Sequence, residues 1–468
     1  MNNDSSAARV AGSVRAWIAS NPSATTLPST RTLAREHGVG PVTVQHAVQL
    51  LVADGVVETK PGAGTFVVRA EPRRTGDVSW QSTALGPSPA VDFPGSGVRS
   101  VPDGTTALHT GYPSPALLPG ALVRSALQRV AREPDAYLGS SAPAGEPALR
   151  SWFARELDRG GPGGLFDADD VVVTSGGQAA ISAVLRALTA PGDTIVMESP
   201  TYWGAIAAAR AQGLRIVPVA RSRDGIDPAD LDAALTMHDA RVFYAQPTYA
   251  NPTGSVWTAD VRAGVRDVLV RRKAFMLEDD WARDLFLGAQ PPPPMAAGDV
   301  DGHILYVRSL TKSVSPSVRV AALVSRGPVL ARIRATRWVG ELLVPRLTQR
   351  IALDVVSSAG WARGGAGLRR GLRARRDALV SAVRDASHLT VEAVPDGGVG
   401  LWVALPKRVD PAELTAVCLD RGVALSPGHE WFPAEQPGPF VRLAFAGESE
   451  DRYVEAVQVV EDAVRESM

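Results

Sequence analysis

Lysine is rare in this chain, and its rarity limits the places where a primary amine could do chemistry. Four of the 49 lysine and arginine residues are lysines, namely Lys60, Lys273, Lys312 and Lys407. Lys312 follows the apolar run ILYVRSLT, which is typical of a buried strand, whereas Lys273 lies in a basic run and Lys407 in a loop. Because ligands of open α/β sheets bind beyond the carboxyl ends of the strands, Lys312 is the candidate for amine chemistry.

Polar and aromatic side chains also follow the other apolar runs. Gly176, Gly177 and Gln178 follow the run VVVTS, and Tyr202 lies shortly after TIVMES. Asn251 follows FYAQPTYA, and Asp279 and Asp280 follow AFMLE. Each feature has an ordinary interpretation, such as a tight strand–helix turn, a helix cap or a surface charge. Taken with Lys312, they supply an amine for a Schiff base, an acid for a pyridine nitrogen, a ring stacker and phosphate ligands. The set predicts a pyridoxal phosphate site.

Regular alternation of strands and helices would position these residues. From about residue 107, apolar runs alternate with helical stretches, which predicts a mostly parallel sheet between helix layers. From about residue 366, a long helix precedes the shorter runs LTVEAV, GLWVALP, GVALS and FVRLAFA. This change predicts a smaller α+β subdomain over 366–468.

Residues 1–70 form a separate pattern. A helix after Ser29 that ends at Gly38 is followed by a helix from Pro41 to about Gly55 and by two short β runs around a Pro-Gly turn. This order predicts a winged helix-turn-helix. Residues 71–106 are rich in Pro, Gly and Ser and lack periodicity, which is typical of a linker.

Composition excludes several classes of protein. The 468 residues are 45% hydrophobic with a formal net charge of zero, so any nucleic-acid site must be local. Cys418 is the only cysteine, which excludes an intramolecular disulfide and a cysteine zinc site. No signal peptide or long apolar segment is visible, so we expect a soluble cytoplasmic protein without a membrane partner. The basic cluster on the long helix indicates a solvated face with ion pairs rather than a nucleic-acid site, and comprises Arg369, Arg370, Arg373, Arg375 and Arg376.

The order of these motifs resembles a known combination of domains. The segments SGGQ, SPTYWG, NPTG, EDD, SLTK and FVRLAFA follow the motif order of the fold-type I aminotransferases, and residues 1–70 resemble a GntR-type winged helix. An aminotransferase-like domain behind such a head is typical of the MocR family of transcriptional regulators. The resemblance implies a homodimer with cofactor sites at the subunit interface.

The resemblance also assigns roles to individual residues. Lys312 should form the Schiff base with pyridoxal 5'-phosphate, Asp279 should pair with its pyridine nitrogen, Asn251 should donate to its phenolate oxygen, and Tyr202 should stack on its ring. Arg442 in FVRLAFA matches the arginine that pairs with an effector or substrate carboxylate, although a cross-strand ion pair is the alternative. The expected phosphate ligands are Gly177, Gln178, Ser309, Thr311 and Arg319.

Three positions depart from the family pattern. Trp281 stands where a tyrosine is common, and an indole N–H can donate but cannot accept a hydrogen bond. Ser140 replaces a tyrosine that reaches the phosphate of the partner subunit, and Arg308 replaces a small glycine. These departures favour cofactor binding without efficient turnover.

The head should bind operator DNA through three groups of residues. The resemblance implies phosphate contacts at the start of the second helix, base contacts in the major groove and backbone contacts from the wing. Six basic and four acidic residues in 1–70 leave little net charge, so we expect two heads to act together. A winged helix used for protein contact is the alternative. The expected DNA-binding residues are Ser29 and Arg31, then Thr43, Gln45 and His46, then Lys60, Gly62 and Gly64.

The sequence therefore favours a regulator that binds DNA at the nucleoid and senses a small amino compound through its cofactor. A working aminotransferase with a fused head is the alternative function, and pyridoxal phosphate itself is an alternative effector.

Overall fold

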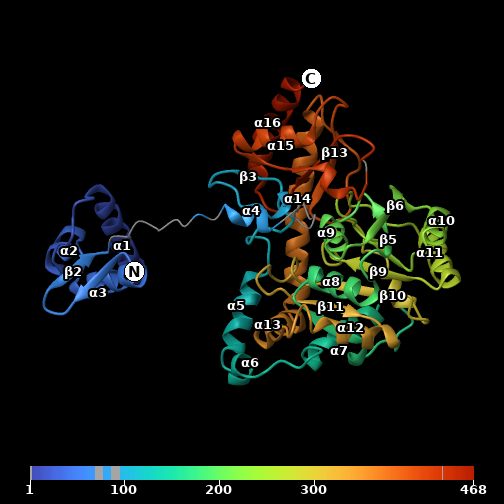
Figure 1. Ribbon diagram of the computed structural model, residues 1–468, viewed down its shortest axis with the longest axis horizontal. Coiled ribbons are helices and arrows are strands. Elements are labelled where there is room, and N and C mark those ends of the chain that lie inside the picture. Colours follow the sequence, from blue (N-terminus) through green and yellow to red (C-terminus); the bar gives the residue numbers. More distant parts are fainter. Residues whose placement is uncertain (1–2, 69–76, 78, 86–94, 435) are drawn as a thin grey trace. The chain divides into compact units, whose positions relative to one another are not determined.

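The computed structural model describes residues 3–68, 77, 79–85, 95–434 and 436–468 (Figure 1). The chain divides into two compact units, Met1–Pro87 and Ser88–Met468, which we describe separately as the head and the body.

The head is a winged helix-turn-helix, as the sequence predicts. Its elements are α1 (Asn3–Ser20), α2 (Thr30–His37), α3 (Pro41–Ala53), β1 (Val57–Lys60), β2 (Gly64–Val67) and a short helix α4 (Trp80–Ala84). Ser29 caps α2 by accepting a hydrogen bond from the Thr32 N–H at 3.2 Å, and Gly38 ends the helix in the left-handed conformation. The chain before α2 bonds to β2 through Leu27 N–H, an addition to the wing that the sequence does not predict.

The body is built on an eight-stranded sheet whose central strands run parallel. Strand β11 is antiparallel to both of its neighbours, β10 and the edge strand β4, and the other edge strand, β7, is antiparallel to β6. In spatial order the strands are β4 (Val171–Thr174), β11 (Ala321–Val324), β10 (Ile304–Ser309), β9 (Phe275–Asp280), β8 (Val242–Ala245), β5 (Thr194–Ser199), β6 (Arg215–Ser222) and β7 (Gly225–Ile226).

Helices cover both faces of this sheet. Ile195 and Tyr244 pack with α8 (Gly177–Leu188), α9 (Trp203–Ala211) and α12 (Pro328–Arg337) on one face. Val196 and Phe243 pack on the opposite face with a second group of helices. Burial of both faces explains why the strand sequences are apolar throughout. The second group comprises α5 (Gly120–Val130), α6 (Pro134–Leu138), α7 (Pro147–Asp158), α10 (Pro228–Met237), α11 (Ala259–Arg272) and α13 (Arg346–Ser357).

The C-terminal part forms the smaller α+β subdomain. Its four-stranded sheet has the order β12, β13, β16, β15, and Leu108 joins its apolar core. Its elements are α14 (Trp361–Asp385), β12 (Thr390–Val391), β13 (Gly400–Ala404), α15 (Pro411–Asp420), β14 (Val423–Ala424), β15 (Ser426–Pro427), β16 (Phe440–Ala444) and α16 (Tyr453–Glu466).

The end of the predicted linker belongs to the body. Strand β3 (Thr106–Ala107) pairs in parallel with β14, and Ser96 is only 3% exposed. Residues 95–106 therefore pack on the body, although the sequence predicts a linker up to residue 106. The predicted linker residues 71–76, 78 and 86–94 lie outside the described residues. Within the described residues, no helix is long and apolar enough to cross a membrane.

Candidate functional site

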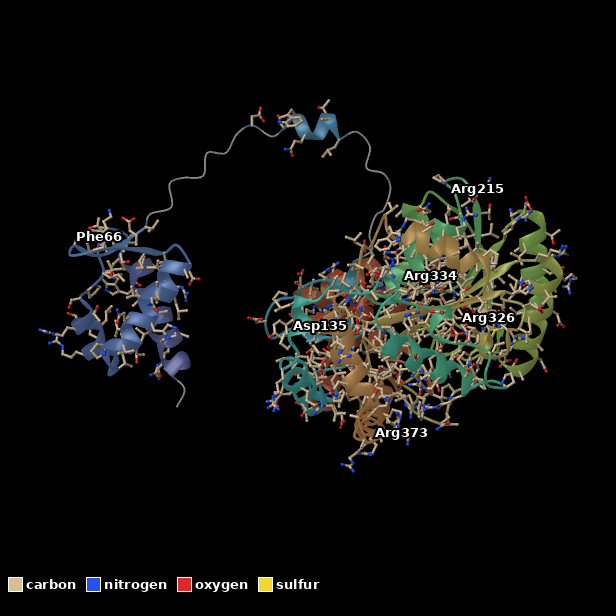
Figure 2. All side chains as sticks on the ribbon, turned by 90° about the horizontal axis from the view of Figure 1, so that it is seen from below. Phe66, Asp135, Arg215, Arg326, Arg334 and Arg373 are labelled. Carbon is tan, nitrogen blue, oxygen red and sulfur yellow. The ribbon has the colours of Figure 1, made fainter. Side chains whose placement is uncertain are left out.

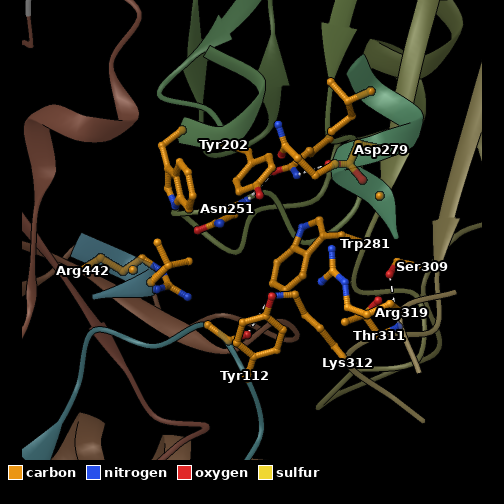
Figure 3. A pocket seen from close by; sticks show the side chains of 18 of the residues that line it. Tyr112, Tyr202, Asn251, Asp279, Trp281, Ser309, Thr311, Lys312, Arg319 and Arg442 are labelled. Atoms are coloured by element: carbon orange, nitrogen blue, oxygen red, sulfur yellow. Dashed lines mark hydrogen bonds between the residues drawn. The ribbon is translucent and has the colours of Figure 1, made fainter. Parts of the chain in front are cut away.

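A cavity of about 280 Å³ lies where the carboxyl ends of the body strands meet the small subdomain (Figure 3). Strands β9 and β10 each end at a residue that lines it or directly precedes one. The structure brings all of the predicted cofactor and effector residues to this cavity, namely Gly177, Gln178, Tyr202, Asn251, Asp279, Ser309, Thr311, Lys312, Arg319 and Arg442.

Lys312 occupies the middle of the cavity wall. Its Nζ donates a hydrogen bond to the Gly111 carbonyl at 2.7 Å and lies 4.7 Å from the Tyr112 ring and 4.9 Å from the Trp281 ring. Burial, with the positive charge of Arg442 as the next cause, lowers the pKa of the Lys312 amine to about 7. A substantial fraction of this amine is therefore neutral, and hence nucleophilic, near neutral pH.

Asp279 lies at the end of β9 and is held by two side chains. Its Oδ2 accepts hydrogen bonds from the Tyr244 hydroxyl at 2.8 Å and from Gln246 Nε2 at 2.7 Å, and its Oδ1 accepts neither. Burial raises the pKa of Asp279 to about 6. A cation placed against this carboxylate would offset the cost of burying its charge. The carboxylate is therefore a suitable partner for the N–H of a pyridinium ring.

Asn251 and Tyr202 present one amide and one ring to the cavity. The Asn251 Oδ1 accepts a hydrogen bond from Trp431 Nε1 at 3.2 Å, so its amide nitrogen remains as the donor. The Asn251 backbone N–H donates to Gln246 Oε1 at 2.8 Å, which ties this residue to the one that holds Asp279. Burial raises the pKa of Tyr202 well above its usual value, so the ring stays neutral.

An anion cradle lies at the start of α8. Gly176 precedes the helix with φ +93°, and a Cβ there would approach the Arg319 guanidinium to 2.9 Å, so the loop needs a glycine. The hydroxyl of Thr311 is buried and without a hydrogen-bond partner among the described residues. A helix N-terminus, an arginine and an unpaired hydroxyl form a donor set that fits a phosphate group.

Arg442 is a buried guanidinium that has no ion pair among the described residues. It is 3% exposed, donates only a long hydrogen bond to the His109 carbonyl at 3.5 Å, and lies 5.7 Å above the Trp431 ring. Burial lowers its pKa to about 10. Among the described contacts, Arg442 forms no cross-strand ion pair, which was the alternative interpretation of this residue. A buried cation without an ion pair can bind a carboxylate strongly.

The three departures from the family pattern have different structural outcomes. The Trp281 indole N–H donates to the Tyr249 carbonyl at 3.1 Å, so it is already engaged. Arg308 is buried and pairs with Asp284 at 3.0 Å, which gives it a structural role. Ser140 is exposed.

Several residues of the site escape the sequence analysis. Gln246 ends the run FYAQ, so the strand-end criterion that found Asp279 could also have found it. Tyr112, His109 and Gly97 line the cavity from a segment that follows no long strand, and no comparable signal marks them. Among the described residues, no group of three or more His, Cys, Asp or Glu could hold a metal ion.

The predicted DNA-binding residues of the head are mostly accessible. Arg31, Gln45 and Lys60 are exposed, His46 is half-buried, and Gly62 and Gly64 have positive φ in the wing. Lys60 also pairs with Glu58 at 2.8 Å.

Thr43 requires a correction, because the structure places it on the wrong face of α3 for groove contact. It is only 8% exposed, since Thr43, Ala47 and Leu51 recur at helical spacing on the buried face of α3.

The arginine cluster on α14 is largely structural. Arg375 is buried and donates to the Ala446 carbonyl at 2.8 Å, and Arg376 donates to the Pro395 carbonyl at 2.8 Å. Arg369 lies over the Phe286 ring, whereas Arg373 is exposed and extends away from the body (Figure 2). Arg370 and Arg373 are exposed and Arg376 pairs with Asp377 at 2.7 Å, as a solvated face with ion pairs requires, whereas the burial of Arg375 departs from that prediction.

Comparison with known protein families matches each unit separately. Residues 115–460 match the family described as aminotransferase class I and II. Residues 6–67 match the family described as bacterial regulatory proteins, gntR family.

Some similar proteins are named as transcriptional regulators and others as aminotransferases. The uncharacterized HTH-type transcriptional regulator YdfD of Bacillus subtilis (strain 168) is 25% identical over 442 residues, covering 91% of this chain and 89% of the relative. The probable rhizopine catabolism regulatory protein MocR of Rhizobium meliloti is 28% identical over 438 residues, covering 90% and 86%. The crystal structure of LysN, an alpha-aminoadipate aminotransferase from Thermus thermophilus complexed with N-(5'-phosphopyridoxyl)-L-leucine, is similar with a TM-score of 0.73 and 25% identity, covering 83% of this chain and 99% of LysN.

Proposed function

The chain belongs to the aminotransferase class I and II family and has a gntR-type head, and we propose that it is a transcriptional regulator that senses an amino compound through pyridoxal phosphate. The observation that carries this proposal is the cavity, which unites an amine, a carboxylate and an unpaired guanidinium on the same chain as a DNA-binding fold.

The cavity residues fit pyridoxal phosphate. The cradle of Gly177, Thr311 and Arg319 would hold the phosphate, and Asp279 would hold the pyridine nitrogen. When bound, the cofactor supplies an aldehyde that condenses reversibly with primary amines. Lys312 offers the resident amine, and its low pKa keeps that amine reactive near neutral pH.

Arg442 supplies the selectivity for the effector. Its guanidinium is desolvated and lacks an ion-pair partner among the described residues, so a carboxylate entering the cavity gains a strong pair without breaking an existing one. We therefore propose that the effector carries both a primary amine and a carboxylate. Operator binding by the head would hold the protein at the nucleoid.

Trp281 favours sensing over turnover. Its indole N–H is bound to the Tyr249 carbonyl, and its ring lies beside Lys312 at 4.9 Å. No ionisable phenol stands at this position to assist proton transfer during a complete reaction. Because the cavity contains all of the cofactor residues expected from the aminotransferases, an active aminotransferase is the second candidate function. Pyridoxal phosphate itself is the second candidate effector.

We also propose that the body forms a homodimer. Large apolar side chains stand exposed on α6 and in the loop before α13, where Leu138 is 79%, Val339 85% and Leu342 65% exposed. Exposed apolar groups of this size are typical of an interaction surface. Light scattering of the purified body, compared with a variant carrying Leu138→Asp and Leu342→Asp, would measure the expected loss of the dimer.

The test of the function combines two measurements on purified full-length protein. The absorbance of bound pyridoxal phosphate is followed while amino acids are added, with and without a keto acid, and operator affinity is measured under the same conditions. The proposal expects an amino acid that alters the absorbance and the operator affinity without multiple turnover. Rapid turnover with unchanged operator affinity would favour the aminotransferase.

A further inference from the structure

Part of one wall of the cavity comes from the segment of residues 95–101, which we call the strap. Gly97 and Val98 line the cavity, and a Cβ at Gly97 would lie 3.5 Å from the Trp203 indole nitrogen. Val98 is 55% exposed at the rim, although its side chain is apolar. A ligand that fills this part of the cavity therefore meets the strap directly.

Two attachments hold the strap to the body. The Ser96 hydroxyl donates a hydrogen bond to the Glu430 carboxylate, and both residues are buried at 3% and 7% exposure. A ring nitrogen of His109, Nε2, lies 3.1 Å from the Arg99 carbonyl. Burial raises the pKa of the Glu430 carboxyl to about 7. A hydrogen bond buried in this way is specific for one arrangement of the strap, because breaking it would leave buried polar groups unpaired.

Both attachments lead to the groups that would bind the cofactor and the effector. Glu430 precedes Trp431, whose Nε1 donates to Asn251 and whose ring lies under Arg442. The His109 carbonyl accepts the hydrogen bond from Arg442 at 3.5 Å. The strap is thus joined through single residues to the carboxylate partner and to the amide donor of the cavity.

The strap is also the first described stretch of the body after residues 86–94, so the chain that comes from the head enters the body through it. We call the part of the cavity beside Arg442 the effector half and the part beside Lys312 and Asp279 the cofactor half. We propose that the strap transmits to the linker whether a ligand occupies the effector half, and that the hydrogen bond between Ser96 and Glu430 positions the strap for this. This inference rests on the proposed sensing function. A ligand that binds the attached strap better than the detached strap shifts the population of the two states.

The experiment uses full-length protein and two ligands that differ in how much of the cavity they fill. Pyridoxal phosphate fills only the cofactor half, whereas N-(5'-phosphopyridoxyl)-L-leucine also extends into the effector half. Hydrogen–deuterium exchange is measured for peptides that cover the strap, and operator affinity is measured by fluorescence anisotropy. The variant is Ser96→Ala, and the matched control is Ser100→Ala, which removes an exposed hydroxyl from the same strap.

We expect the conjugate, but not pyridoxal phosphate, to slow exchange of the strap at least about fivefold and to change operator affinity by about fivefold or more in the wild type and in Ser100→Ala. Ser96→Ala should bind the conjugate within about twofold of the wild type but should lose both responses. The strap proposal is overturned if Ser96→Ala keeps both responses, if it no longer binds the conjugate, or if both probes slow exchange equally. If the conjugate slows strap exchange but leaves operator affinity of the wild type unchanged, the sensing function fails while the occupancy response of the strap stands.

Discussion

Replacement of Arg442 by alanine tests the effector half of the cavity most directly. The guanidinium is 3% exposed and donates a hydrogen bond to the His109 carbonyl at 3.5 Å. Among the described residues no carboxylate lies within ion-pair distance of it, although the charge of the Glu430 carboxyl acts on it from farther away. The cost of removing it from water has therefore already been met in the folded protein. A ligand carboxylate would gain nearly the full strength of a buried charge-assisted pair.

The expected magnitude follows from this geometry. Loss of one partner of a buried, hydrogen-bonded charge pair costs about 2–5 kcal/mol. A ligand carboxylate would also weaken the existing hydrogen bond from Arg442 to the His109 carbonyl. We therefore expect the ligand carboxylate to contribute about 2–4 kcal/mol to the binding free energy, somewhat below the top of that range. This free energy corresponds to a preference of about 30- to 700-fold in Kd for a ligand with a carboxylate over the same ligand without one.

Matched ligands isolate this contribution. Calorimetry on full-length protein compares N-(5'-phosphopyridoxyl)-L-leucine with N-(5'-phosphopyridoxyl)-3-methylbutylamine, which differs only by the absent carboxylate. The wild type and the control Arg370→Ala, which removes an exposed arginine from α14, should prefer the leucine conjugate. Arg442→Ala should bind both conjugates alike. A variant that retained the preference would refute the assignment of Arg442 as the carboxylate partner.

Three further predictions concern the amine and the head. Lys312→Ala should abolish the borohydride-sensitive absorbance band of bound pyridoxal phosphate, and Lys273→Ala should keep it; the reverse result would place the reactive amine elsewhere. Because a neutral amine reacts and the pKa of Lys312 is lowered to about 7 from 10.5, the rate of cofactor uptake by apoprotein should rise as the pH passes through about 7, and a rise centred near 10.5 in stopped-flow absorbance would contradict this. Arg31→Ala should weaken binding to all DNA sequences and reduce the salt slope by about one, whereas Gln45→Ala should cost about 1–3 kcal/mol at a single base pair, as measured by anisotropy against a set of operator variants.

The large sheet and the cofactor half of the cavity could be predicted because they depend on local signals. Strands buried on both faces are apolar along most of their length, so runs such as the one that leads to Asp279 and Asp280 stand out. The carboxyl ends of parallel strands meet at one edge, which places Lys312 and Asp279 together without further information.

The remaining features depend on contacts between distant parts of the chain. The strap contains Gly and Ser and resembles the linker before it, and contacts such as the hydrogen bond from Ser96 to Glu430, 334 positions away, make it part of the site. The engagement of Trp281 by the Tyr249 carbonyl is equally non-local. The burial of Thr43 could not be predicted, because the packing of α3 against α1 decides which side of α3 faces the core, and the sequence of α3 is apolar on more than one side.

The environment of Lys312 supports the proposal that this site holds a ligand rather than processing it. The Gly111 carbonyl and the rings of Tyr112 and Trp281 offer contacts to an ammonium group, but burial outweighs them and lowers the pKa of Lys312 to about 7. Arg442 opposes that charge, since it is one of the groups that lower the pKa of Lys312. A carboxylate paired with Arg442 would offset this opposition and raise the pKa of Lys312. We therefore infer that capture of a carboxylate-bearing amine and protonation of the displaced lysine favour each other, which stabilises the ligand-bound state. A protonated lysine held by Gly111 is a poor base, and a regulator requires only that this bound state persist long enough to alter the affinity for its operator.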